Sequence, residues 1–467
     1  STAPPRTGSA GRTGGRRHLE EEALMQARQG PGRRRLVAAL ATLACGSALL
    51  TACGGGDSGK PTLNWYINPD GQETLTMLAE KCSTSEYDIA IQLLPTSATD
   101  QRTQLARRLA ARDSSTDLMS LDPVFVAEFA NAGWLAPFEG EQAEAVLDDD
   151  VLEGAAATAV WEDEVVAAPQ WANTQVLWYR QSLADAAGLE IGPDSPVTWS
   201  QVIEAAASQE GATVGVQADR YEAYVVWINS LIQGAGGAIV EDTEAGRDAE
   251  VTIDSEAGQA AAAVIEQLAD SGATQPDFTT SNEGTSLGRM FPEEGPGEFM
   301  TNWTFAYKNY EDTIGVPGGP VDKEAFEDFA WARYPQTVEG EESRPPIGGI
   351  DIGVGAYSEN LDYAQEAAVC VTSPESQAAL AVTDGLMPSR NSVYDSPELQ
   401  KAYPPDLLDL YRQSIDTGAP RPKSAFYAQI SSAVQSVWHS PTSVSPGTTP
   451  EESAEFLRQV LSGEALL

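Results

Sequence analysis

The chain has 467 residues, a length that predicts two or three domains, and its apolar content is typical of well-packed globular proteins. Its formal net charge is −41, and residues 53–467 alone carry 20 basic against 66 acidic side chains, a net charge of −46. Such a charge excludes nucleic acids and anionic lipid surfaces as electrostatic partners, because both are negatively charged themselves.

An apolar run near the N-terminus is the most informative single stretch. It follows three arginines and covers 36–53 with the sequence LVAALATLACGSALLTAC. This pattern predicts a cleaved secretion signal that leaves Cys53 as a lipidated first residue. The alternative is a transmembrane anchor, since the 17 residues 36–52 are at the lower limit for spanning a bilayer. The small residues before Cys53 and the polar GGGDSGKP segment after it favour cleavage.

The signal divides the N-terminal part of the chain into three segments. Residues 1–24 precede Met25 and are expected to be a non-native or disordered extension. Residues 25–52 form the lipoprotein signal peptide, and residues 53–61 form a flexible tether. The protein is therefore expected on the extracellular face of the cell membrane, held there by its lipid.

Four cysteines are present, and two of them, Cys45 and Cys53, belong to the N-terminal segments just described. The remaining pair is Cys82 and Cys370. An exported and therefore oxidising setting favours a disulfide between them, and two buried free thiols are the alternative. Neither has a Cys or His near it in the sequence, so no metal site is expected there.

Segments after the tether alternate between strand and helix patterns, which predicts an α/β domain with a largely parallel sheet. Strands are expected at 62–67, 89–94 and 117–122, and helices at 72–83 and 100–112. Further strands are expected at 164–169, 176–180, 214–216, 299–303 and 348–356, and 329–334 precedes a proline-rich loop at 335–346. Further helices are expected at 124–132, 199–208, 221–233, 255–271, 360–372 and 374–383, with mostly helical segments to the end.

Catalytic motifs are scarce in the sequence. His439 is the one histidine of residues 53–467, and nothing around it resembles a nucleophile elbow, so it is expected to be solvated or locally bonded. Calcium loops and glycine-rich nucleotide-binding sequences are absent, so neither a metal nor a cofactor is expected. A glycosidase needs only two well-placed carboxylates, which leaves that alternative open.

Aromatic residues stand beside amides and carboxylates at several expected strand ends and loops. These groups are Trp65, Tyr66, Asn68 and Asp70; Asp122; Trp171, Asn173 and Gln175; Tyr221, Tyr224 and Trp227; and Asn302 with Trp303. Indole rings pack against the C–H faces of sugars, and planar amides and carboxylates bind hydroxyl groups, so this mixture favours a carbohydrate site. Trp178, Trp199 and Trp227 are individually expected to lie in the core.

Ordered sequence blocks resemble one known family. After the lipid-attachment pattern, the blocks are DQRTQLARRLAARDSSTDLMSLD, AEFANAGWLAPF, AAPQWANTQVLWYR, FMTNWTFAY, PIGGIDIGVGAYS and VCVTSPESQAALAVTDGLMPSR. In this order they resemble the extracellular solute-binding proteins of sugar ABC importers, the maltose-binding-protein-like class. Within that class the blocks look most similar to trehalose-binding lipoproteins, whose relatives bind maltose-type or glucosyl-polyol ligands.

The resemblance implies a two-lobe, type II periplasmic-binding-protein-like α/β fold that closes around a ligand. Lobe 1 is expected to comprise 62–170 and about 335–360, and lobe 2 about 171–334 and 361–467. Crossing segments are expected near 169–174, 334–346 and 356–365. Such a protein is not an enzyme: as a monomer it captures trehalose or a related glucosyl disaccharide and delivers it to ABC permease subunits.

The resemblance also implies a set of ligand-binding residues. Asp122 would accept hydrogen bonds from sugar hydroxyls, Arg390 would donate a forked pair, and Trp303 would supply a stacking face. Amides, a carboxylate and close backbone approach would come from Asn173, Gln175, Asn68, Asp70, Gly348, Gly349 and Ile350, with Glu283 as a further candidate. The helices of Cys82 and Cys370 have counterparts near the hinge, which fits a disulfide clamp.

Three alternatives remain open from the sequence. The first is a secreted carbohydrate-active enzyme such as a glycosidase. The second is a binding protein for maltose-type sugars. The third is a binding protein for a non-sugar solute such as a peptide or polyamine; the acidic charge favours a polyamine, and the aromatic and amide residues argue against it.

Overall fold

The structure is a computed structural model that describes residues 59–192, 195–319 and 321–467. The expectations for the extension 1–24, the signal 25–52 and the lipidated Cys53 lie outside the described residues. Within the described ranges, no helix is both long and apolar enough to cross a membrane.

The first lobe begins with three parallel strands joined by helices, as the sequence predicts. The sheet as a whole is mixed and not largely parallel, because later strands pair antiparallel. Strand β1 (Thr62–Ile67) pairs in parallel with β2 (Asp88–Leu93) on one side and with β3 (Leu118–Leu121) on the other. Helices α1 (Gln72–Cys82) and α2 (Ala98–Ala110) connect these strands. Because apolar residues of α2 recur at helical spacing, one face of that helix is buried in the lobe.

Strand β6 (Ala168–Arg180) belongs to both lobes. Its first half pairs antiparallel with β12 (Ile347–Val354), which also pairs antiparallel with β3. Its second half pairs with β10 (Glu298–Trp303) and β11 (Phe329–Ala332). The sequence predicts two strands, 164–169 and 176–180, with a polar segment between them. The structure instead continues one strand through that segment, because its residues also find ladder partners in β12.

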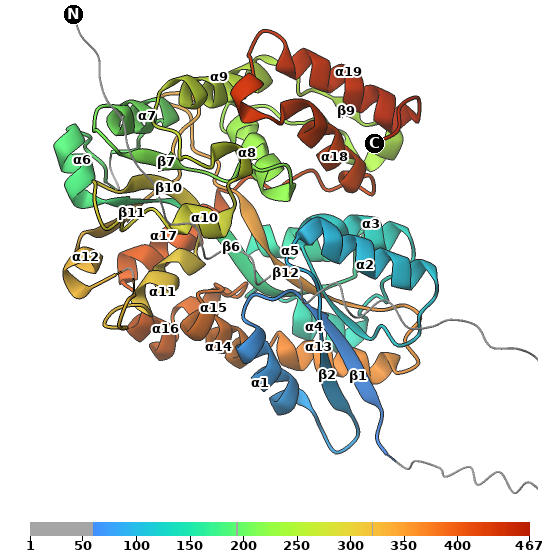
Figure 1. Cartoon of the computed structure of the whole chain (residues 1–467). Helices are drawn as coiled ribbons and strands as arrows, with labels where there is room; N and C mark the ends of the chain where they lie inside the picture. The colour runs from blue at the N-terminus through green and yellow to red at the C-terminus, as the bar shows by residue number, and fades with distance from the viewer. Residues whose placement is uncertain (1–58, 193–194, 320) are drawn as a thin grey trace, which may run out of the picture. The chain divides into compact units, whose positions relative to one another are not determined.

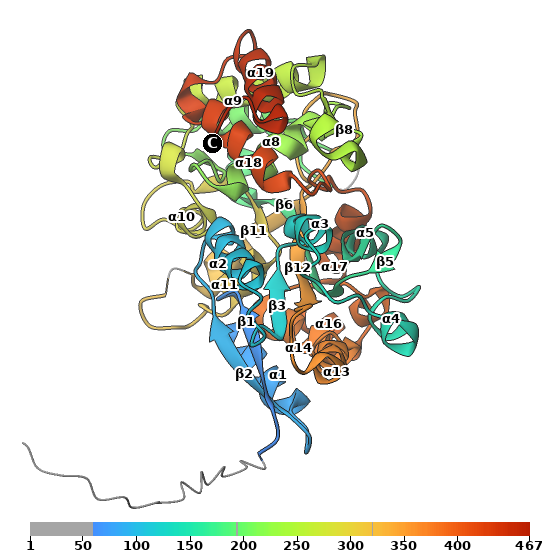
Figure 2. The ribbon, with the colours of Figure 1, turned by 90° about the vertical axis from the view of Figure 1, so that its right-hand side faces the viewer.

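All of these strands form one path, with the order β2-β1-β3-β12-β6-β10-β7, and β11 pairs with β6 beside it. Strand β7 (Thr213–Gly215) closes the far end in parallel with β10. Figures 1 and 2 both show β6 and β12 between two groups of helices. One group contains α1, α13 (Leu361–Val371) and α14 (Pro374–Asp384), and the other contains α8 (Glu222–Gln233), α9 (Glu256–Asp270), α18 (Tyr427–Trp438) and α19 (Thr449–Ser462).

The second lobe has a large apolar core around β7 and β10. Helices α7 (Trp199–Ala207), α8 (Glu222–Gln233), α9 (Glu256–Asp270), α18 (Tyr427–Trp438) and α19 (Thr449–Ser462) contribute to it. Trp199 and Trp227 lie in this core as predicted, with ring centroids 5.6 Å apart. On the opposite face of the sheet, Trp178 stacks on Phe329 in a second cluster with a centroid separation of 5.1 Å.

Helix α13 (Leu361–Val371) packs in lobe 1, although the predicted boundary assigned 361–467 to lobe 2. Its alanine-rich face packs in the same apolar cluster as α1 and β12, and Gln365 donates a hydrogen bond to the carbonyl of Pro137 at 2.8 Å. The expected third crossing at 356–365 therefore lies inside lobe 1. The chain reaches α18 later, through residues 417–426, where Ala419 donates to the carbonyl of Pro345 at 2.7 Å.

A disulfide joins Cys82 at the end of α1 to Cys370 in α13, with a Cα–Cα distance of 5.8 Å. Both helices pack in the core of lobe 1. The bond therefore stabilises one lobe internally and does not clamp the two lobes together, which differs from the expected position near the hinge.

The remaining elements complete the two lobes. The helices are η1 (Pro123–Phe125), α3 (Val126–Asn131), α4 (Gly140–Val146), α5 (Glu153–Ala159), α6 (Gln181–Ala187), η2 (Thr243–Asp248), η3 (Phe278–Thr280), α10 (Glu283–Leu287), α11 (Phe305–Glu311), α12 (Lys323–Glu327), α14 (Pro374–Asp384), α15 (Asn391–Tyr394), α16 (Pro397–Ala402), α17 (Pro405–Asp416) and η4 (Pro441–Ser443). The short strands are β4 (Val160–Trp161), β5 (Glu164–Val165), β8 (Val240–Glu241) and β9 (Glu250–Val251).

Candidate functional site

A cleft with a volume of about 860 Å³ is lined by residues of both lobes and of the strands that connect them. This volume is in the range of small-molecule sites. Most of the residues expected at a binding site line it: Asn68, Asp70, Asp122, Asn173, Glu283, Trp303, Gly348, Gly349 and Ile350. The cleft therefore brings together residues that are far apart in the sequence.

Two of the expected residues do not line the cleft. The guanidinium of Arg390 is buried in lobe 1, where it donates to the carboxylate of Asp148 at 2.7 Å and to the carbonyl of Ala145 at 2.6 Å. Gln175 is buried beneath the cleft surface, and its amide donates to Gln217 at 3.0 Å. Both side chains point into the protein, where they have hydrogen-bond partners.

Several aromatic residues near the expected site also belong to the core. Trp65 is fully buried and donates to the hydroxyl of Ser120 at 3.2 Å. Tyr224 and Trp227 are buried in the core of lobe 2. Only Trp171, Tyr221 and Trp303 remain as aromatic cleft residues from the groups that the sequence singled out.

Trp303 lies directly against the backbone of β12, and two glycines of that strand make this close approach possible. A Cβ atom on Gly348 would lie 2.9 Å from the Trp303 indole. Gly349 has a φ of +140°, and a Cβ atom there would lie 2.1 Å from the carbonyl oxygen of Trp171. Side chains at either position would displace the indole or the β6–β12 pairing, so both glycines shape the cleft floor.

Asn68 and Asp70 follow β1 and form a polar corner of the cleft. The Asn68 amide donates to the Asp70 carboxylate at 2.8 Å, which fixes the orientation of both groups. The Asn68 Oδ1 atom is buried and has no hydrogen-bond partner among the residues that the structure describes. An acceptor in this position is suited to a ligand hydroxyl, because an unsatisfied buried polar atom is costly.

Tyr221 and Glu283 form a second polar corner on lobe 2. The Tyr221 hydroxyl donates to the Glu283 carboxylate at 2.5 Å. Desolvation by burial raises the pKa of Glu283, and the nearby charge of Asp70 across the cleft adds to this effect. Glu283 thus lies on the cleft, and the Tyr221 hydroxyl orients its carboxylate.

The sequence analysis missed Arg421, a buried cation that lines the cleft, as Lys308 also does. Its guanidinium donates to Asp122 of lobe 1 at 2.9 Å and to Glu222 of lobe 2 at 2.7 Å, and its side chain is only 4% exposed. Arg421 lies in a short segment, Pro420 to Pro422, that matches no motif and has no periodicity. No local pattern in the sequence could have indicated it.

Asp351 lies on β12 beside the cleft floor and is fully buried. Its carboxyl group lies 2.8 Å from the Thr158 hydroxyl, which also lies 2.7 Å from the carbonyl of Ala155. One hydroxyl proton cannot serve both acceptors, whereas a proton on Asp351 would satisfy all three oxygens. Desolvation by burial raises the pKa of Asp351 from 3.8 to about 7, with a further contribution from the charge of Asp122.

This buried carboxyl group predicts a pH-dependent stability. Because the folded pKa is raised, its stabilising contribution is complete below about pH 4 and is lost as the pH rises to about 7. Asp351→Asn keeps the neutral form and is expected to be about 2–4 kcal/mol more stable than the original protein at pH 8. Urea unfolding of both proteins between pH 4 and pH 8 measures the difference. A stability difference that does not change with pH would contradict the assignment.

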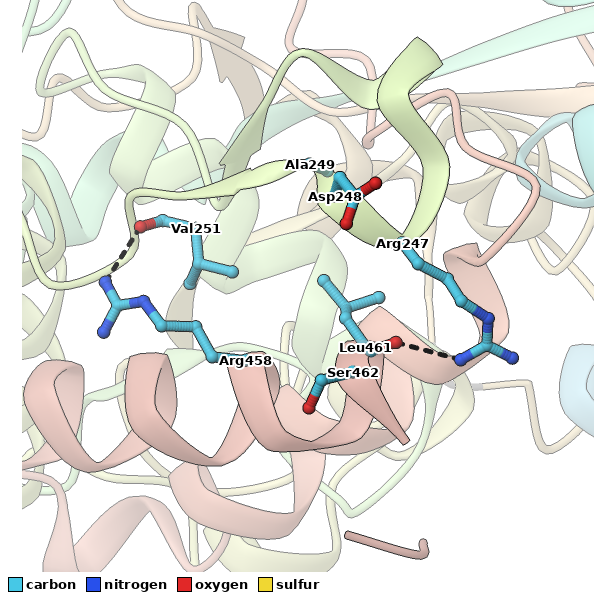
Figure 3. Close-up of a pocket in the computed structure, with 7 residues that line it drawn as sticks. All are labelled: Arg247, Asp248, Ala249, Val251, Arg458, Leu461 and Ser462. Atoms are coloured by element: carbon cyan, nitrogen blue, oxygen red, sulfur yellow. Dashed lines mark hydrogen bonds between the residues drawn. The ribbon is translucent and has the colours of Figure 1, made fainter. Parts of the chain in front are cut away.

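A smaller hollow of about 320 Å³ lies where η2 and β9 meet α19, and Figure 3 shows its lining. Arg247 donates to the carbonyl of Leu461 at 2.9 Å, and Arg458 donates to the carbonyl of Val251 at 3.1 Å. Arg458 also pairs with Asp254 at 2.9 Å. These hydrogen bonds and this ion pair connect α19, the C-terminal helix, to the rest of lobe 2.

His439 directly follows α18, and its Nε2 atom lies 3.1 Å from the carbonyl oxygen of Thr279. This contact confirms the expectation of a locally bonded side chain. Among the described residues, no group of three or more His, Cys, Asp or Glu side chains could hold a metal ion.

The family model of the bacterial extracellular solute-binding proteins matches residues 78–404, well over half of the chain. The chain belongs to this family. The predicted two-lobe α/β fold of such proteins is confirmed by solved structures that match nearly the whole described part of the chain. Maltose-bound MalE3 of T. maritima is 22% identical, with a TM-score of 0.73 over 87% of this chain and 100% of that chain.

Two further solved structures extend this comparison. The GacH receptor of Streptomyces glaucescens, solved unliganded and with acarbose, is 25% identical, with a TM-score of 0.70 over 86% of this chain and 99% of that chain. The cyclic α-maltosyl-1,6-maltose binding protein of Arthrobacter globiformis is 20% identical, with a TM-score of 0.66 over 87% of this chain and 100% of that chain.

The curated relatives of this solute-binding protein match shorter stretches. A probable ABC transporter-binding protein of Deinococcus radiodurans is 25% identical over 59% of this chain, and a mannitol-binding protein of Pseudomonas aeruginosa is 28% identical over 30% of it. The matched stretches span only 64% and 32% of the lengths of those two relatives.

Proposed function

We propose that this solute-binding protein is the ligand-binding subunit of an ABC importer for a carbohydrate, with trehalose or a related glucosyl disaccharide as its ligand. The observation that carries the proposal is the cleft itself. The indole ring of Trp303 lies in the cleft among amide and carboxylate groups from both lobes, including those of Asn68, Asn173 and Asp122. Sugars need this combination, because their C–H faces are apolar and their hydroxyl groups require planar acceptors and donors.

The ligand-binding residues in this proposal are Asn68, Asp70, Asp122, Asn173, Glu283, Trp303, Gly348, Gly349 and Ile350, together with Arg421. The ligand would contact both lobes at once and thereby favour the closed state, which is the signal that a permease requires. No bond of the sugar is altered in this scheme, and the protein acts as a monomer. Similar proteins are described as bound to maltose or acarbose, which makes maltose-type sugars the alternative ligands.

Isothermal titration calorimetry of the intact protein with trehalose, maltose and mannitol tests the proposal. Binding of trehalose at micromolar concentrations, about −8 kcal/mol, is the expected result. Tighter binding of maltose would retain a sugar site but change its ligand, and tighter binding of mannitol would indicate a polyol site. Release of glucose from trehalose or maltose would favour the glycosidase alternative, and the absence of any heat with all three compounds would contradict a carbohydrate function.

The proposal includes a lipid anchor at Cys53, which keeps the protein beside its permease on the outer face of the cell membrane. Cys53→Ser should release the protein into the medium, because the lipid supplies the membrane affinity. Its sugar affinity should be unchanged, because the cleft is built entirely from later residues. Fractionation of cells, followed by calorimetry of the released protein, measures both effects. Retention of the variant in the membrane fraction would contradict the anchor.

A further inference from the structure

Glu222 is the first residue of α8, and its buried carboxylate accepts hydrogen bonds from three side chains. It accepts hydrogen bonds from the Arg421 guanidinium at 2.7 Å, from the Ser431 hydroxyl at 2.6 Å and from the Tyr427 hydroxyl. Its side chain is 6% exposed. Desolvation by burial raises the pKa of Glu222, and the charge of Arg421 opposes this effect. Such a group is stable as an ion only while its cationic partner stays in place.

The partners of Glu222 connect the two lobes. Arg421 also donates to Asp122, which directly follows β3 in lobe 1, with nitrogen–oxygen distances of 2.9 Å and 3.4 Å. The Tyr427 ring packs edge-on against Phe125 of lobe 1, with 6.0 Å between the centroids. Glu222 and Ser431 lie on helices of the lobe 2 core. The network therefore spans the cleft floor from one lobe to the other.

The bonds on the two sides of Arg421 are unequal. Both carboxylates line the cleft, but Glu222 is almost fully buried and has two further hydrogen-bond donors, whereas the Asp122 side chain is 18% exposed. Arg421 thus makes its shortest and most buried contact with Glu222 of lobe 2, and its two longer hydrogen bonds to Asp122 depend on the position of lobe 1.

We propose that Glu222 is a positioning residue, which holds the Arg421 guanidinium on the cleft floor so that it engages lobe 1 and the bound ligand together. The inference rests on the proposed sugar-binding function and extends it. Without the Glu222 charge, the guanidinium has one carboxylate partner in place of two, and its orientation on the cleft floor is no longer set by lobe 2.

A double-mutant cycle of ligand affinity tests this role. Calorimetry with trehalose and maltose compares the original protein with Glu222→Gln, Arg421→Gln and the double variant. Glu222→Gln is expected to weaken binding at least tenfold. The double variant is expected to bind as Arg421→Gln does, within about twofold, because Glu222 acts through Arg421. Losses that multiply in the double variant, or an unchanged affinity of Glu222→Gln, would overturn the inference.

Two further variants separate positioning from stability. Asp328 is a matched control, since this lobe 2 carboxylate accepts from Arg180 at 2.8 Å and from Ser182 at 2.6 Å and does not line the cleft. Asp328→Asn should lower the melting temperature and leave sugar affinity unchanged. Ser431→Ala removes one donor from Glu222 without touching Arg421, and should weaken binding severalfold even if Glu222→Gln fails to fold.

The outcomes also distinguish this inference from the function on which it rests. If the original protein binds neither sugar, the proposed function fails and the inference falls with it. If the original protein binds sugar and Ser431→Ala and Glu222→Gln both retain full affinity, only the positioning role is overturned.

Discussion

Arg421→Gln should weaken sugar binding by about 30- to 1,000-fold, a loss of about 2–4 kcal/mol. Two causes contribute to this loss. The variant removes the cation of the cleft floor, and it leaves the carboxylates of Asp122 and Glu222 facing each other without the charge that both now contact. Calorimetry with trehalose and maltose, at a temperature where the variant is folded, measures the change in affinity.

Arg390→Gln is the matched control for this experiment. Its side chain is 5% exposed, compared with 4% for Arg421, and it also pairs with a carboxylate, Asp148. Because Arg390 does not line the cleft, its replacement should lower the free energy of unfolding and leave the affinity unchanged. The opposite pattern, with affinity lost in Arg390→Gln and kept in Arg421→Gln, would support the residue implied by the family resemblance over the one that the structure places in the cleft.

Reduction of the disulfide between Cys82 and Cys370 should produce the largest change in stability. The bond closes a sequence separation of 288 residues, and cross-links of long loops are typically worth about 2–5 kcal/mol. Urea unfolding with and without a reductant measures this contribution. The sugar affinity of the folded, reduced protein should be unchanged, because both cysteines lie in the lobe 1 core and not on the cleft.

The double variant Cys82→Ser, Cys370→Ser provides the control. Its unfolding midpoint should match that of the reduced protein and should not respond to reductant, because the remaining cysteines are not part of this cross-link. An original protein whose midpoint is insensitive to reductant would show that the cross-link does not contribute to stability. Loss of sugar affinity on reduction would instead show that the packing of lobe 1 shapes the cleft.

Local patterns predicted most of the strands and helices, since apolar spacing reports burial directly. The helix expected at 100–112 is present because Leu105 and Leu109 fall on one face and are buried. Local patterns could not predict how helices distribute between lobes. Helix α13 joins lobe 1 because its small alanines suit close packing in the cluster of α1 and β12, a contact that depends on residues far away in the sequence.

Gly348 and Gly349 were expected on the cleft from the family resemblance, and the structure gives a backbone reason for their position there. Gly348 and Gly349 stand where any side chain would collide with Trp303 or with β6, so their place on the cleft floor follows from the strand itself. Polar side chains were harder to place, since an arginine forms equally good bonds in a core or in a cleft. Arg390 and Arg421 have similar burial, and only their tertiary partners tell them apart.

The position of β12 has a consequence for the order in which the chain can fold. This strand lies between β3 and β6 in the sheet, yet it is synthesised after all the strands of lobe 2. Until residues 347–354 are available, β3 and β6 each have an unpaired edge at the centre of the molecule. A nascent chain therefore cannot complete lobe 1 early, and it stays incompletely folded until most of it has been made. Late completion suits a member of an extracellular family, because an unfinished fold is easier to thread across a membrane than a finished one.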